Sequence, residues 1–334
     1  MEAADRKFEF CRPQELAQDM VFIDGISRSG KSLVAPILSS FDRCELWQMN
    51  YIYEYLCVMD FFRGISRDSA STLARLYADI DLYNLMIGRC TNFRPTDESS
   101  VSFNLLYEKY QDRLHRIEGD SIKEKIFKER PITPFVTHYI FGVADLLFDA
   151  FKHRLRLFIV TTRHPLWIIE AWFSLKWGRR IGTDERDYHV CQKFKGKVLP
   201  WFASGWEEEY LQLPPLDQAI RLINELTSAQ KRQLERLTDE EKKKVIFIPL
   251  ECFMTNPDKY FDIIFRKLET RKTSKTDEIY RKFQFPRSIE KNYLVKQKKH
   301  MDGLFSLNKL TKESQELVEH MSHNYEKRFL YTNL

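Results

Sequence analysis

The stretch VFIDGISRSGKSLVAPIL occupies residues 21–38. Residues Val21 to Asp24 predict a short buried strand, and an apolar helical segment begins after Lys31. Between them, Gly25 to Ser32 spell G-x-x-x-x-G-K-S without a mismatch. A strand, a glycine-containing loop and a helix start are together typical of a phosphate-binding loop. This stretch therefore predicts the first unit of an α/β fold.

Phosphate binding follows from the residue types in this loop. Glycines let the backbone turn tightly, so that several N–H groups can point at one anion, and the helix N-terminus adds partial positive charge. Lys31 adds a full positive charge. We therefore expect the chain to bind a phosphorylated nucleotide through eight loop residues: Gly25, Ser27, Arg28, Ser29, Gly30, Lys31, Ser32 and Leu33.

The bulk composition is that of a globular protein. Of 334 residues, 43% are apolar and 30% are charged, and the net charge of +5 suits an anionic ligand but is too weak to predict nucleic-acid binding. Six cysteines lack the C-x-x-C spacing of zinc sites, so we expect reduced thiols and no metal. The N-terminal residues lack the pattern of a secretory leader, and no apolar run is long enough for a membrane span. The expectation is a soluble, cytoplasmic protein.

Strands alternate with helices along the rest of the chain. Apolar segments at residues 134–138, 155–160 and 245–250 predict further strands, and helical segments follow each. The continuous apolar run at 155–160 is typical of a central parallel strand. Residues of about 50–130 are rich in helix formers and aromatics and predict a helical insertion. We thus expect one domain over 1–334, with a doubly wound, mostly parallel sheet and helices on both faces.

Four segments, in this order, resemble the PAPS-dependent sulfotransferases, which share the P-loop nucleoside-kinase fold. They are GISRSGKSL, PFVTHY, VTTRHPLWIIEAW and FIPLECFMTNPDKYFDII, and they span most of the chain from residue 21 to about 264. The resemblance implies an enzyme that transfers a sulfuryl group from PAPS to a hydroxyl or amine and releases PAP. The acceptor would be an unidentified small molecule, carbohydrate or peptide, and no metal is expected.

The same resemblance assigns roles to individual residues. Arg28 lies at the basic position of the family's 5′-phosphosulfate loop, and Arg163 lies at the arginine that binds the nucleotide 3′-phosphate. His138, in the pair Thr137-His138, matches the catalytic base. We take Arg28, Lys31 and His138 as the candidate catalytic residues.

Three positions depart from the family's pattern. Lys31 and Val136 stand where the family has a threonine and, often, a second catalytic lysine. Ala171 stands where the family has a serine for the 3′-phosphate, and Ser174, one helical turn later, is the expected substitute.

These departures leave two alternatives open. In a P-loop kinase, or another phosphotransferase that uses ATP and Mg²⁺, Lys31 would contact the β- and γ-phosphates and Ser32 would bind the metal. Glu251 is the strand-end acid that would support it. The third possibility is a nucleotide-binding interaction protein without catalysis.

Overall fold

A computed structural model describes residues 9–116 and 119–331 of the chain. The central sheet has the strand order β2-β3-β1-β4-β7, and every pairing in it is parallel. Its strands are β1 (Asp19–Asp24), β2 (Gln48–Met49), β3 (Ile132–Val136), β4 (Leu155–Thr162) and β7 (Val245–Pro249). The predicted doubly wound parallel sheet is confirmed, with β4 between two neighbours. The start of the N-terminal segment, on which the expectation of no leader depends, lies outside the described residues.

The strands are buried because both faces of the sheet are covered. Along β1, Met20 and Phe22 belong to one hydrophobic core, while Val21 and Ile23 belong to the other. Successive side chains of a strand point to opposite faces, so one strand supplies both cores. The uninterrupted apolar runs in the sequence are therefore typical of strands covered on two sides.

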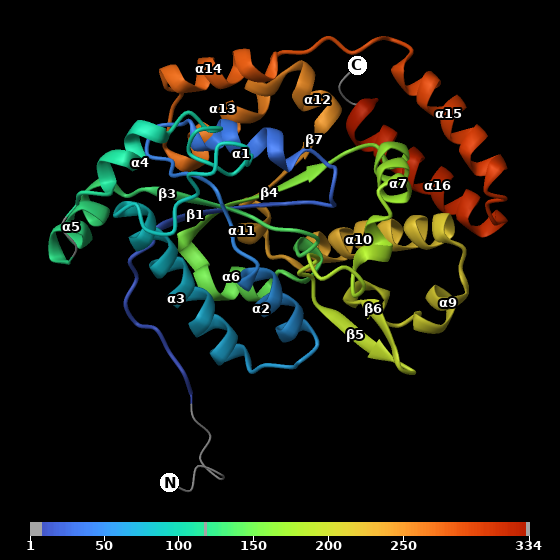
Figure 1. Cartoon of the computed structure of the whole chain (residues 1–334), viewed down its shortest axis with the longest axis horizontal. Coiled ribbons are helices and arrows are strands. Elements are labelled where there is room, and N and C mark those ends of the chain that lie inside the picture. Colours follow the sequence, from blue (N-terminus) through green and yellow to red (C-terminus); the bar gives the residue numbers. More distant parts are fainter. Residues whose placement is uncertain (1–8, 117–118, 332–334) are drawn as a thin grey trace, which may run out of the picture.

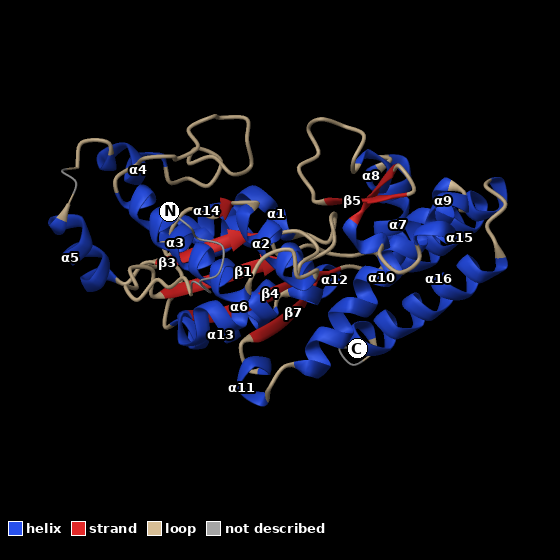
Figure 2. Ribbon diagram, turned by 90° about the horizontal axis from the view of Figure 1, so that it is seen from below, coloured by secondary structure: helices blue, strands red, loops and turns tan. Residues whose placement is uncertain are grey.

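Helices from different parts of the chain cover the two faces (Figures 1 and 2). One face packs against α1 (Lys31–Ser39), α12 (Leu250–Thr255), α13 (Pro257–Leu268) and α14 (Ser274–Phe283). The other face packs against α2 (Ile52–Phe61), α3 (Arg67–Met86), α6 (Asp145–Phe151), α7 (Pro165–Ser174) and α10 (Pro215–Arg236). The C-terminal helix α16 (Lys312–Tyr325) joins the second core through Val318 and Met321.

The predicted helical insertion is confirmed between β2 and β3, where α2 and α3 are followed by α4 (Tyr107–Arg113) and α5 (Asp120–Glu129). A small antiparallel hairpin, β5 (Cys191–Phe194) and β6 (Lys197–Pro200), lies outside the central sheet and was not predicted. The remaining helices are α8 (Trp177–Arg180), α9 (Glu207–Gln212), α11 (Asp239–Lys242) and α15 (Tyr293–Leu307).

Parallel pairing brings the ends of four strands to one edge of the sheet. Ile23 pairs with Val136, Asp24 pairs with Val160, and Thr162 pairs with Pro249. The segments that follow β1, β3, β4 and β7 therefore share this carboxyl edge, where ligands bind in open α/β sheets.

Two further expectations concern the whole chain. Within the described ranges, none of the helices combines the length and the apolar character needed to cross a membrane. All six cysteines are free, as the sequence predicts.

Candidate functional site

The loop after β1 has a backbone path that requires glycine at both ends. A Cβ atom added to Gly25 would lie 2.4 Å from the backbone oxygen of Thr161 on the neighbouring strand. Gly30 has φ +105°, a conformation that side chains rarely adopt, and an added Cβ would lie 2.6 Å from Leu250 Cδ1. The loop thus approaches β4 and α12 more closely than any other residue type permits.

Side chains of the loop are tied to three surrounding segments. Ser29 Oγ lies 2.7 Å from Thr161 Oγ1, and Ser27 Oγ lies 2.5 Å from the hydroxyl of Tyr139. The indole N–H of Trp172 donates to the carbonyl oxygen of Ser27 over 3.2 Å. These contacts fix the loop before any ligand arrives.

The charges of the loop differ in their exposure. Lys31 is buried at the start of α1, and its Nζ donates to the Gly25 carbonyl over 2.6 Å. Burial lowers the pKa of Lys31 to about 8. Arg28 and Ser32 are exposed, and no side chain caps α1, whose N-cap is Gly30. An uncapped helix start beside a lysine is suited to an anion.

Arg163 follows β4 and lies beside the loop. Its Nη1 donates to the Arg28 carbonyl over 3.3 Å, and its guanidinium lies 5.9 Å from the ring centre of Trp167. Arg163 and Ser29 both line a cavity of about 680 Å³, with walls from α10, α16 and the helical turn after α16 that include Lys231, Tyr325 and Arg328. This volume is in the range of cofactor sites. The cavity is rich in cations and connects directly with the phosphate-binding loop.

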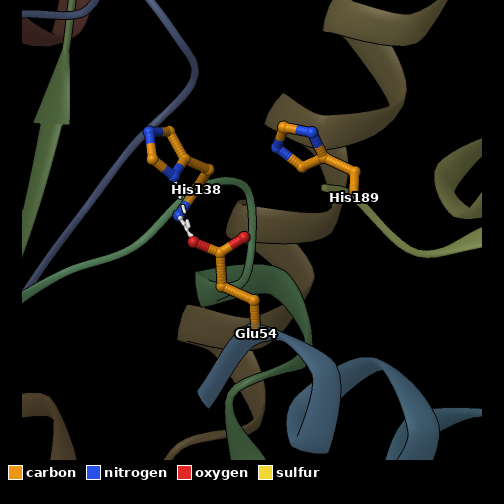
Figure 3. A group of neighbouring side chains, drawn as sticks. All are labelled: Glu54, His138 and His189. Carbon is orange, nitrogen blue, oxygen red and sulfur yellow. Dashed lines mark hydrogen bonds and ion pairs between the residues drawn. The ribbon is translucent and has the colours of Figure 1, made fainter. Parts of the chain in front are cut away.

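His138 follows β3, on the other side of β1, and is held by a buried glutamate that the sequence did not single out. Glu54 Oε1 on α2 accepts the backbone N–H of His138 and lies 3.0 Å from its Nδ1. Figure 3 shows this pair, with Nε2 of His138 pointing away from the carboxylate. Burial raises the pKa of Glu54 to about 8. Burial, aided by the charge of Lys31, lowers the pKa of His138.

A second histidine lies beside this pair. His189, from the segment before β5, turns its ring toward Glu54 and His138 (Figure 3). Ligand atoms of the three side chains lie within 4.8 Å of one another. His189 Nδ1 lies 2.7 Å from Asp187 Oδ1. The carboxyl edge therefore carries a buried acid–base cluster next to the phosphate-binding loop.

The candidate residues divide into two groups. The eight loop residues, Arg163 and His138 share the carboxyl edge of the sheet. Ser174 instead lines a second cavity of about 420 Å³, together with Trp172, Lys176 and Arg179. Ser174 and Arg163 therefore line different cavities among the described residues.

The sequence missed Glu54 and His189 because neither lies in a recognisable motif. Glu54 is one acid in an aromatic helix, and His189 lies in an irregular segment with Asp187 two residues earlier. The D-x-H spacing of Asp187 and His189 is the one local pattern that could have drawn attention to His189. The approach of α2 and this segment to His138 depends on tertiary packing.

Comparison with known proteins gave fold-level similarities. No protein-family model and no curated protein matches the chain. Solved structures do match, with low identity. A sulfotransferase domain from the curacin biosynthetic pathway aligns with a TM-score of 0.46 and 11% identity over 91% of this chain and 97% of the other.

Two bacterial structures give similar values. Sulfotransferase STF9 from Mycobacterium avium has a TM-score of 0.43 and 13% identity over 95% of this chain and 78% of the other. A sulfotransferase from Alicyclobacillus acidocaldarius has a TM-score of 0.38 and 16% identity over 92% of this chain and 96% of the other. All three are sulfotransferases.

Proposed function

We propose that the chain transfers a sulfuryl group from PAPS to a hydroxyl or amine of a small-molecule, carbohydrate or peptide acceptor, and releases PAP. The observation that carries the proposal is the position of the phosphate-binding loop between two features. On the β4 side is the cation-lined cavity with Arg163, and on the β3 side is the pair of Glu54 and His138.

The cavity suits a nucleotide that carries a phosphate away from its reacting end. Ser29 and Arg163 both line it, so a ligand could bind the loop and the arginine at once. We assign the 5′-phosphosulfate to the loop backbone with Arg28 and Lys31, and the 3′-phosphate to Arg163. Guanidinium groups are well suited to phosphate because their donors match its oxygens in pairs.

The pair of Glu54 and His138 suits the proton transfer that the reaction requires. In the proposed step, the acceptor oxygen forms a bond to sulfur while the bond from sulfur to the bridging oxygen of the donor breaks. Nε2 of His138 takes the acceptor proton, and the Glu54 carboxyl group, 3.0 Å from Nδ1, orients the ring. Arg28 and Lys31 stabilise the negative charge that develops on the leaving phosphate.

The strand ends disfavour the alternative of an ATP- and Mg²⁺-dependent kinase. Glu251, the acid that would support a metal, already accepts the backbone N–H of His164 and the hydroxyl of Tyr325. The central strand β4 ends in Thr161-Thr162, is followed by Arg163, and offers no carboxylate there. A magnesium ion bound to phosphates takes one or two protein carboxylates as ligands.

Calorimetric titration with PAP and with ADP, each with and without Mg²⁺, tests the proposal. We expect PAP to bind without metal and more tightly than ADP, because only PAP has a 3′-phosphate. Binding of ATP that requires Mg²⁺, with no preference for PAP, would contradict the proposal and favour the kinase.

Arg163→Ala tests the assignment within the site. It should weaken PAP binding by about 1.5–3 kcal/mol, the value of a hydrogen bond to a charged group, and leave ADP binding nearly unchanged. Arg179→Ala is the matched control, since Arg179 is exposed and lines the other cavity. Equal PAP affinity in the wild type and a folded Arg163→Ala protein would overturn the assignment.

A further inference from the structure

His189 carries a buried nitrogen that the proposed transfer does not use. Its side chain is only 8% exposed, and its Nε2 has no hydrogen-bond partner among the described residues. A buried polar atom without a partner is costly, so such atoms are rare in native proteins. Figure 3 shows that this nitrogen points toward Glu54 and His138.

The other ring nitrogen of His189 determines what Nε2 can do. Nδ1 lies 2.7 Å from Asp187 Oδ1, and the same oxygen accepts the His189 backbone N–H over 3.2 Å. Asp187 therefore holds the proton on Nδ1 and leaves a lone pair on Nε2. Carboxylate support of this kind orients histidines that bind metal ions.

The geometry points to a cation at this place. We propose that Glu54, His138 and His189 form a binding site for a divalent transition-metal ion, with Asp187 as the supporting carboxylate. One ligand atom from each of the three residues lies within 4.8 Å of the others. Ligand atoms around a zinc ion, at bond lengths of about 2.0–2.1 Å, lie roughly 3.3 Å apart. A bound ion would therefore require the more distant of these atoms to move closer together.

The donor atoms select the class of ion. Two imidazole nitrogens and one carboxylate oxygen suit Zn²⁺, Co²⁺, Ni²⁺ or Fe²⁺. Mg²⁺ and Ca²⁺ prefer sites made of oxygen atoms and should bind poorly. The proposal departs from the sequence-based expectation that the chain has no metal.

The surrounding charges also favour a cation. The charges of Asp24 and Asp187 favour positive charge at His138, whereas Lys31 and His189 oppose it. A bound ion would take Nδ1 of His138, so the loaded protein could not use the pair of Glu54 and His138 as a base.

The site can be tested with the metal alone, independently of sulfuryl transfer. The 334-residue chain without a histidine tag is titrated calorimetrically with ZnCl₂, and Co²⁺ binding is followed by its visible absorption. We expect one equivalent of metal to bind. The Co²⁺ spectrum should lack a thiolate charge-transfer band, and Mg²⁺ should not compete.

Variants identify the ligands. His189→Ala and Glu54→Gln should each weaken Zn²⁺ binding at least 100-fold, and Asp187→Asn should weaken it about 10- to 100-fold. His153→Ala is the control, because its side chain is 74% exposed, and Cys191→Ser tests the nearest downstream thiol. Both should bind like the wild type.

Two results would overturn the proposal: no stoichiometric binding by the wild type, or wild-type affinity in Glu54→Gln and Asp187→Asn. These two variants preserve side-chain shape, so they remain informative if His189→Ala fails to fold. PAP binding depends on the loop and Arg163, and its loss or retention tests the proposed function separately.

Discussion

At the scale of single residues, His138 is the side chain on which the proposed transfer depends most directly. It follows β3 at the carboxyl edge, its side chain is 14% exposed, and the buried Glu54 orients its ring. Burial is the main cause of the lowered pKa of His138, and the positive charge of Lys31 in the phosphate-binding loop lowers it further. A neutral imidazole in this position can accept a proton.

His138→Ala should therefore lower turnover about 10²- to 10⁴-fold, the usual contribution of a general base, and leave PAP affinity unchanged. PAP release from PAPS is measured in metal-chelated buffer, with whichever alcohol or phenol of a test panel the wild type uses best. His153→Ala provides the exposed-histidine control. Turnover like that of the wild type in a folded His138→Ala protein would remove this residue from the mechanism.

How far the sequence predicts the site depends on how each residue is positioned. The loop and Arg163 follow strands directly, so a local pattern is enough to locate them. Glu54 and His189 reach the same edge from α2 and from the segment before β5. Their approach depends on the packing of elements distant in the chain, which no local pattern encodes.

At the scale of elements, α4 is anchored to the segment before β2 by a buried charge cluster. Glu45 accepts two hydrogen bonds from Arg113, at 2.6 and 2.9 Å, and one from the Tyr110 hydroxyl at 2.5 Å. Lys109 lies 3.2 Å from the same carboxylate. Burial alone would raise the pKa of Glu45, but Lys109 and Arg113 lower it to about 2.

This cluster predicts a loss of stability in acid. Because the folded pKa lies below the unfolded value, Glu45 stabilises the fold above about pH 4.5 and loses that contribution as the pH falls to about 2. The difference corresponds to roughly 3 kcal/mol at most. Glu45→Gln should unfold more easily in urea at pH 7, and its deficit relative to the wild type should shrink between pH 4.5 and 2.

Glu316→Gln is the control for this prediction, since Glu316 is an exposed partner of Lys312 and its loss should change little. A deficit of Glu45→Gln that is constant from pH 7 to 2 would show that the carboxylate charge has no part in anchoring α4.

The helices and strands differ in how well the sequence predicts them. The strands β1, β3, β4 and β7 and the helices that follow them are apolar enough to be recognised in the sequence. Asn256 caps α13 by accepting the Lys259 N–H. The hairpin β5–β6 escaped prediction because its strands are short and only Leu199 and Pro200 in them are buried. Such strands lack the alternation or continuous burial that identifies a strand.

At the scale of the whole molecule, an aromatic cluster joins the central strands to the helices below them. Phe158 on β4 is fully buried, and its ring centre lies 5.8 Å from Phe22, 5.1 Å from Phe141 and 5.8 Å from Phe148. These residues belong to β1, β4, α6 and the turn before α6. The cluster therefore couples sheet and helices into one core.

Phe158→Ala should destabilise the whole protein by about 3–5 kcal/mol, because it removes a buried ring and leaves a cavity. Equilibrium urea unfolding measures this loss, and Phe127→Ala, at a side chain that is 49% exposed, is the control. A loss below about 1 kcal/mol would mean that the core closes around the missing ring.

The cavity beside the phosphate-binding loop has a consequence for synthesis. Ser29 precedes the walls opposite it by roughly two hundred residues or more, because they come from α10, α16 and the helical turn after α16, which includes Arg328. A ribosome releases the loop long before these walls exist. The growing chain therefore passes through a stage in which the loop is complete but has no enclosed nucleotide cavity, and ligand can support folding only after translation has reached α16.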